Sequence, residues 1–183
     1  NASQIFLEGH KNGRFGSAIT ATMEGTRPLL IEAQALTNPT VFGYPKRAGS
    51  GFDLNRLQLL TAVIQKHLKF NLGNQDVYIN IVGGFTLRDP AADLAVAMAI
   101  ISSLKKEPLS ANAIILGEIG LSGEVRPVIQ LEKRLQEAEK LGFTLAITGK
   151  IHKKISTKTL KIIMVEDLEQ ALQAAKIASK QDD

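Results

Sequence analysis

The stretch TLRDPAADLAVAMAI, residues 86–100, runs from a charged turn into an almost wholly apolar segment. Asp89 is placed to cap a helix, and Pro90 would be its first residue, where the missing N–H of proline costs no hydrogen bond. A Gly-Gly pair at 83–84 precedes the turn. A tight turn before a helix is a common place for a nucleophile or a bound anion, yet Ala91 and Ala92 carry no reactive group.

The apolar pattern on both sides of this helix predicts an α+β chain. Alternating or continuous apolar runs favour strands, and apolar residues three and four apart favour helices. Residues 38–55 hold two prolines and three glycines, so we expect a long irregular loop there. The expected strands are 3–7, 17–25, 29–37, 76–84, 113–121, 124–128, 144–149 and 161–166, and the expected helices are 54–70, 90–105, 131–141 and 167–180. We expect a single domain over 1–183, with a β-rich segment and the long loop in 1–52 and an α/β core in 53–180.

Composition limits the kinds of site that the chain can carry. Its 183 residues include no cysteine, and its three histidines lack metal-ligand spacing, so no metal site is expected. Residues 1–20 hold no long apolar run and no later run could cross a bilayer, which favours a cytoplasmic protein without a membrane partner. The net charge is +4, and residues 1–75 carry all of it, with eight basic and four acidic residues. This modest excess favours a polyanionic partner only weakly.

Motifs of nucleotide and hydrolase chemistry do not occur. The sequence has no G-x-x-x-x-G-K-[ST] loop, and the glycines of GEIGLSG at 117–123 are spaced wrongly for a dinucleotide fingerprint. GLSGE at 120–124 differs from the G-x-S-x-G of a nucleophile elbow. We therefore expect no cofactor in this chain.

Two segments, GGFTLRDPAADLAVAMAI at 83–100 and GEIGLSGEVRPVIQLEKRLQEA at 117–138, resemble the signature segments of the Lon protease proteolytic domain. That family uses a serine nucleophile at the helix start and a lysine general base in the second segment. Ala91 and Glu132 stand at those two positions here, and the neighbouring Lys133 and Arg134 are expected to face elsewhere. The resemblance therefore implies a protease-like scaffold without its Ser-Lys pair, and we expect no enzyme activity from the chain.

Further motifs, TMEGTRPLLIEAQAL, KRAGSGFDLNRLQLLTAVI and NQDVYINIVGG, resemble the C-terminal Lon-like domain of the bacterial RadA (Sms) family of DNA repair proteins. The resemblance covers roughly residues 3–175. It implies a fold like ribosomal protein S5 domain 2, a ring-shaped homohexamer and a role in recombination. In that family ATP, Mg and Zn belong to an ATPase core and a zinc finger that precede this domain and drive branch migration. RecA recombinase is an implied partner through the full-length protein.

The basic residues within these motifs are the candidate DNA contacts: Arg27, Lys46, Arg47, Arg56 and Arg88. Arginine suits phosphate because its planar fork donates two hydrogen bonds at once, and we expect binding of single- or double-stranded DNA independent of sequence. A solvated charge or a salt bridge is the alternative role for each residue. Two other functions stay open, an oligomerisation scaffold with little DNA contact and, less favoured, an active Ser-Lys peptidase.

Overall fold

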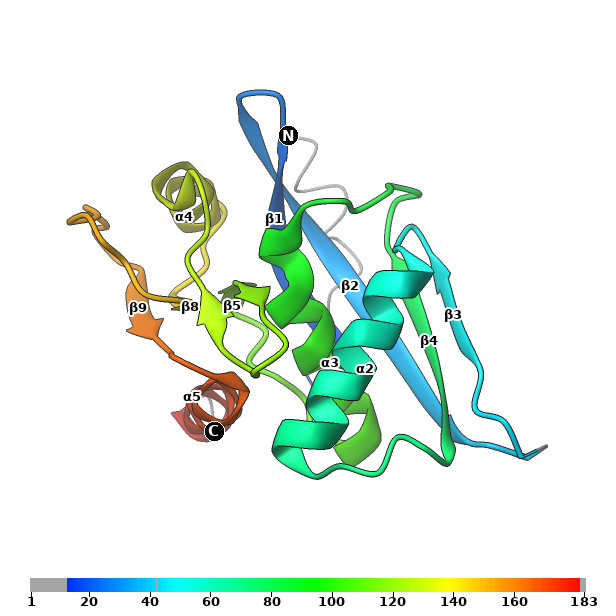
Figure 1. The fold of residues 1–183 in the computed structure, drawn as a ribbon. Coiled ribbons are helices and arrows are strands. Elements are labelled where there is room, and N and C mark those ends of the chain that lie inside the picture. The colour runs from blue at the N-terminus through cyan, green and yellow to red at the C-terminus, as the bar shows by residue number, and fades with distance from the viewer. Residues whose placement is uncertain (1–12, 42, 182–183) are drawn as a thin grey trace.

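A mixed seven-stranded β-sheet forms the centre of the fold (Figure 1). The computed structural model describes residues 13–41 and 43–181. The strands lie in the order β3-β4-β2-β1-β5-β8-β9; β2 runs antiparallel to β1 and β4, and the other neighbours are parallel. Their bounds are β1 (Ser17–Glu24), β2 (Arg27–Pro39), β3 (Arg47–Ser50), β4 (Gln75–Ile81), β5 (Ala113–Leu116), β8 (Leu145–Thr148) and β9 (Lys161–Met164). A short ribbon pairs β6 (Glu118–Ile119) with β7 (Val125–Arg126).

Helices cover both faces of this sheet because its inner strands are apolar on both sides. Ala18 of β1 belongs to the core under α2, α3 and α5, whereas its neighbour Ile19 belongs to the core under α4. The α3 helix is buried from Asp93 to Ser103, as expected for a helix that is apolar all round. The helices are α2 (Leu54–Leu68), the single 3-10 turn η1 (Pro90–Ala92), α3 (Asp93–Lys105), α4 (Leu131–Lys140) and α5 (Leu168–Gln181).

The α+β class and the two predicted helix caps are confirmed. The carboxylate of Asp53 accepts the N–H of Arg56 at 2.8 Å, and that of Asp89 accepts the N–H of Ala91 at 3.0 Å. The helix predicted over 90–105 starts as η1 and continues as α3. These local features followed from the sequence because a cap needs only a polar side chain beside its own helix.

The long loop expected over 38–55 is wrong in part. β2 extends to Pro39, and β3 occupies Arg47–Ser50 in parallel pairing with β4, with Arg47 opposite Val77. The RAGS sequence of β3 has no apolar alternation, so only a distant partner strand makes it a strand. The strand expected at 3–7 lies outside the described residues. Within the described ranges, the structure has no helix that is both long and apolar enough to cross a membrane.

Candidate functional site

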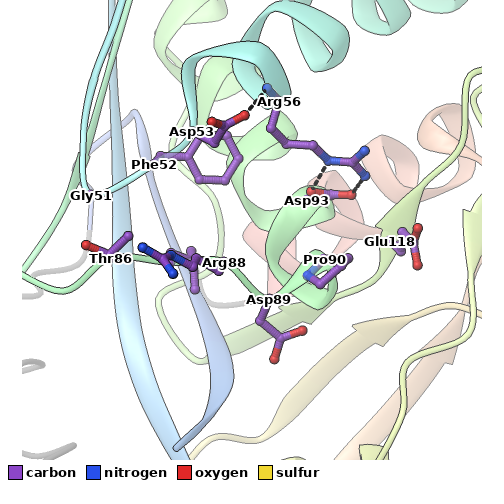
Figure 2. A pocket seen from close by; sticks show the side chains of 11 residues that line it. Gly51, Phe52, Asp53, Arg56, Thr86, Arg88, Asp89, Pro90, Asp93 and Glu118 are labelled. Atoms are coloured by element: carbon purple, nitrogen blue, oxygen red, sulfur yellow. Dashed lines mark hydrogen bonds and ion pairs between the residues drawn. The ribbon is translucent and has the colours of Figure 1, made fainter.

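A pocket of about 670 Å³ opens between the start of α2 and the turn that leads into α3 (Figure 2). Its two walls are joined where the N–H of Leu87 donates to the carbonyl of Gly51 at 2.7 Å. Both helix starts, with their capping carboxylates, border the same cavity. The lining residues are Gly51, Phe52, Asp53, Arg56, Thr86, Leu87, Arg88, Asp89, Pro90, Asp93 and Glu118.

The Arg56–Asp93 ion pair closes one side of the pocket, as Figure 2 shows. The guanidinium donates to both carboxylate oxygens of Asp93, with Nε 2.9 Å from Oδ1, and also to the carbonyl of Ile119 at 3.2 Å. The N–H of Ile119 in turn donates to Asp93 at 3.1 Å. Arg56, a predicted DNA contact, therefore holds α2, α3 and β6 together, which is the structural alternative for this residue.

Burial and pairing change the pKa values of both partners. The Asp93 side chain is only 2% exposed, and this burial raises the pKa of Asp93 against the opposing effects of Arg56 and the Ile119 N–H. The hydrogen bond to Asp93 raises the pKa of Arg56, so the guanidinium stays charged. Asp93 is thus a structural residue of the first turn of α3.

A second ion pair lies behind the turn and was missed by sequence reasoning. Arg134 of α4 is fully buried, and its Nη1 lies 2.6 Å from Asp89 Oδ2 and 2.6 Å from the carbonyl oxygen of Ala21. The prediction that Arg134 faces elsewhere is wrong. Helical spacing contained the signal, because Arg134 is three residues from Leu131 and four from Ala138, which are both buried.

The two positions of the protease-like pair differ in exposure. Ala91 is 4% exposed within η1, beside the first pocket. Glu132 is exposed on α4 and lines a different pocket, with Lys150, His152 and Lys153.

Of the other predicted DNA contacts, Arg27, Lys46 and Arg88 present exposed side chains, and Arg47 does not. Arg27 stands at the β1–β2 hairpin, and Arg88 lines the first pocket with Arg56. Lys46 directly precedes β3, whereas Gly51 directly follows it. The backbone N–H of Lys46 donates to Asp76, and this hydrogen bond lowers the pKa of the Asp76 carboxyl. The structure thus distributes these residues over several elements rather than collecting all of them at one pocket.

Arg47 is half-buried and its guanidinium binds backbone carbonyls. Nη2 donates to Leu72 at 2.7 Å, and Nη1 donates to Gln75 and, at 3.2 Å, to Lys46. These bonds tie the start of β3 to the segment before β4. Within residues 13–41 and 43–181 no group of three His, Asp or Glu side chains is arranged to hold a metal ion.

Comparison with known proteins gives one family and a set of close relatives. The family described as "Subunit ChlI of Mg-chelatase" matches residues 55–151. Proteins named DNA repair protein RadA are 52% identical over 144 residues in Streptococcus pyogenes serotype M1, covering 79% of this chain and 32% of the relative. In Bacillus subtilis strain 168 the identity is 44% over 177 residues, covering 96% and 39%. In Listeria monocytogenes it is 43% over 178 residues, also covering 96% and 39%. The chain thus spans between 32% and 39% of the length of these relatives.

This comparison corrects one prediction. We expected no enzyme activity from the chain. This expectation is wrong, because the matching family is named for a subunit of an enzyme, Mg-chelatase. That expectation rested on Ala91 and Glu132 in place of a serine and a lysine. Replacing one pair of groups excludes one kind of chemistry, and it does not exclude an activity carried by other residues.

Proposed function

Because the chain belongs to the ChlI family and is homologous to the RadA family of DNA repair proteins, we propose that it is a DNA-binding, ring-forming part of a RadA-type protein. The observation that carries this proposal is the identity of 43–52% to proteins named for DNA repair. The mixed sheet around the buried α3 helix supports a fold like ribosomal protein S5 domain 2, the Lon-like fold. Assembly as a homohexamer, support of branch migration, and cooperation with an ATPase core and with RecA recombinase are parts of the same proposal.

The DNA contacts that we propose are Arg27, Lys46 and Arg88, which lie on different elements. These side chains are exposed, and the structure gives their cationic groups no ion pair within the described residues. Phosphate binding needs such free charges, because each contact releases a counterion from the nucleic acid. Arg47 and Arg56 are left out of this set, since their guanidinium groups hold backbone carbonyls and Asp93 in place.

The test is a titration of fluorescein-labelled single- and double-stranded DNA with the 183-residue chain at low and higher salt. The Arg27→Gln/Lys46→Gln/Arg88→Gln variant should bind more weakly. Its slope of log affinity against log salt should fall by about 0.9 for each duplex phosphate contact that is lost. Light scattering on the same samples measures the assembly state. A hexamer that binds no DNA at low salt would instead support the second candidate, an oligomerisation scaffold.

A further inference from the structure

A second basic surface lies between β8 and β9, at the opposite edge of the sheet from β3 (Figure 1). From residue 141 to residue 165 the sequence has five lysines and one histidine and no Asp or Glu. We refer to residues 149–160 as the basic loop. It contains Lys150, His152, Lys153, Lys154 and Lys158, and Lys161 follows at the start of β9.

Glu139 at the end of α4 holds the C-terminal end of the basic loop. One oxygen of this carboxylate accepts the N–H groups of Lys158 at 2.7 Å, Thr159 at 2.6 Å and Leu160 at 3.0 Å. Ile151 and Ile155 pack against the apolar core under α4. Because these hydrogen bonds and apolar contacts hold the backbone of the loop at several points, little backbone ordering is needed when a partner binds.

The lysines of the basic loop are exposed and form no ion pair in the described part of the chain. They are Lys150, Lys153, Lys154 and Lys158. The Glu139 oxygen is occupied by the backbone N–H groups of the loop. Like charges gathered in this way repel one another, and a polyanionic partner removes that repulsion.

A concavity of about 320 Å³ lies beside the basic loop. Lys150, His152 and Lys153 line it, together with the exposed Glu132, whose Oε1 accepts a hydrogen bond from Gln136 at 3.4 Å. Two lysines against one carboxylate leave the concavity with a net positive charge. The remaining lining residues are Pro127, Val128, Gln130, Leu131, Ile151 and Ile155.

We propose that the basic loop is a separate nucleic-acid contact surface that binds the phosphate backbone. Residues 144–165 contain no Phe, Tyr or Trp, so stacking on such rings, on which base recognition in single strands relies, is not available there. Ile151 and Ile155 pack against the core under α4 and also line the concavity. Exposed lysines spaced along the loop offer several contacts to a chain of phosphates.

The test compares two variants of the 183-residue chain that remove the same charge from different surfaces. Lys150→Gln/Lys153→Gln/Lys154→Gln alters the basic loop. The matched control, Lys66→Gln/Lys69→Gln/Lys106→Gln, alters exposed lysines at the far ends of α2 and α3. Binding of labelled duplex DNA is measured over a series of salt concentrations, with thermal unfolding as a check that each variant is folded.

The basic-loop variant should lose affinity and its salt slope should fall by about 2.7, at about 0.9 for each of three phosphate contacts, while the control keeps the parent slope. Equal losses in both variants, or parental binding by the basic-loop variant, would overturn the proposal. So would equally tight binding of poly-L-glutamate, since this would identify a general site for acidic chains. The Arg27→Gln/Lys46→Gln/Arg88→Gln variant is measured in parallel. If this variant alone weakens binding, the basic loop is excluded as a DNA contact and the proposed function stands. If only the basic-loop variant weakens binding, the basic loop binds DNA and Arg27, Lys46 and Arg88 do not.

Discussion

Arg134 of α4 and Asp89 at the start of η1 form an ion pair beneath the pocket, with Nη1 2.6 Å from Oδ2. Only 1% of the Arg134 side chain and 16% of the Asp89 side chain are exposed. The same guanidinium donates to the carbonyls of Ala21 in β1 and Ile129 before α4. One side chain therefore fixes β1, α4 and the turn into α3 relative to each other.

We predict that Arg134→Met lowers the free energy of unfolding by about 3–5 kcal/mol, because it leaves the Asp89 carboxylate and two carbonyls without their donor. Lys133→Met is the control, since its side chain is exposed and the change should stay within about 0.5 kcal/mol. Urea unfolding measures both values. Equal stabilities of the two variants would contradict a structural role for the buried pair.

Arg47 and Lys46 are adjacent basic residues with different roles. Arg47→Gln should destabilise the protein by about 1–3 kcal/mol, because its guanidinium binds the carbonyls of Leu72 and Gln75. Lys46→Gln should leave stability unchanged and weaken DNA binding. Thermal unfolding and a DNA titration of both variants separate the roles, and a swapped pattern would refute the assignment.

Glu139 predicts part of the pH dependence of stability. The backbone N–H of Thr159, followed by those of Leu160 and Lys158, lowers the pKa of Glu139. The folded pKa then lies below the unfolded one, so the contribution is present above the ordinary carboxyl pKa and is lost as the pH falls through the lowered value. Urea midpoints measured from neutral to acid pH should fall less steeply for Glu139→Gln than for the parent. Parallel curves would show that these hydrogen bonds do not favour the ionised form.

Gly51 joins β3 to the pocket, and its backbone conformation excludes other residues. Its φ is +78°, and a Cβ atom there would collide with the backbone oxygen of Phe85. Gly25 in the β1–β2 turn also has a positive φ, +61°, but its surroundings are open. Gly25→Ala should cost about 1–2 kcal/mol from the left-handed conformation alone.

Gly51→Ala should cost clearly more than Gly25→Ala, because the collision adds to the same backbone penalty. The free energies of unfolding of the two variants measure the difference directly. If Gly51→Ala lowers the free energy of unfolding no more than Gly25→Ala, the segment with Phe85 moves aside without penalty, and the prediction is wrong.

The sequence alone determined the features that depend on near neighbours along the chain. Asp53 and Asp89 are caps, and α3 is a buried helix, because capping and helical periodicity are local properties. The sequence also contained the resemblance that led to the RadA family. The strand β3 was not predictable from RAGS, because its hydrogen-bond partner β4 lies about 30 residues away.

Only the tertiary structure decided which basic residues are free to meet a partner. Arg47 and Arg56 have the same charge as Arg88, yet the fold gives Arg47 backbone carbonyls and Arg56 a buried carboxylate. The net charge along the chain places the basic excess in residues 1–75. It does not reveal the basic loop, because the lysines there are balanced in number by acidic residues elsewhere in the sequence. Charges interact across about 8 Å of space at physiological salt and not along the sequence, so their balance is set by the folded surface.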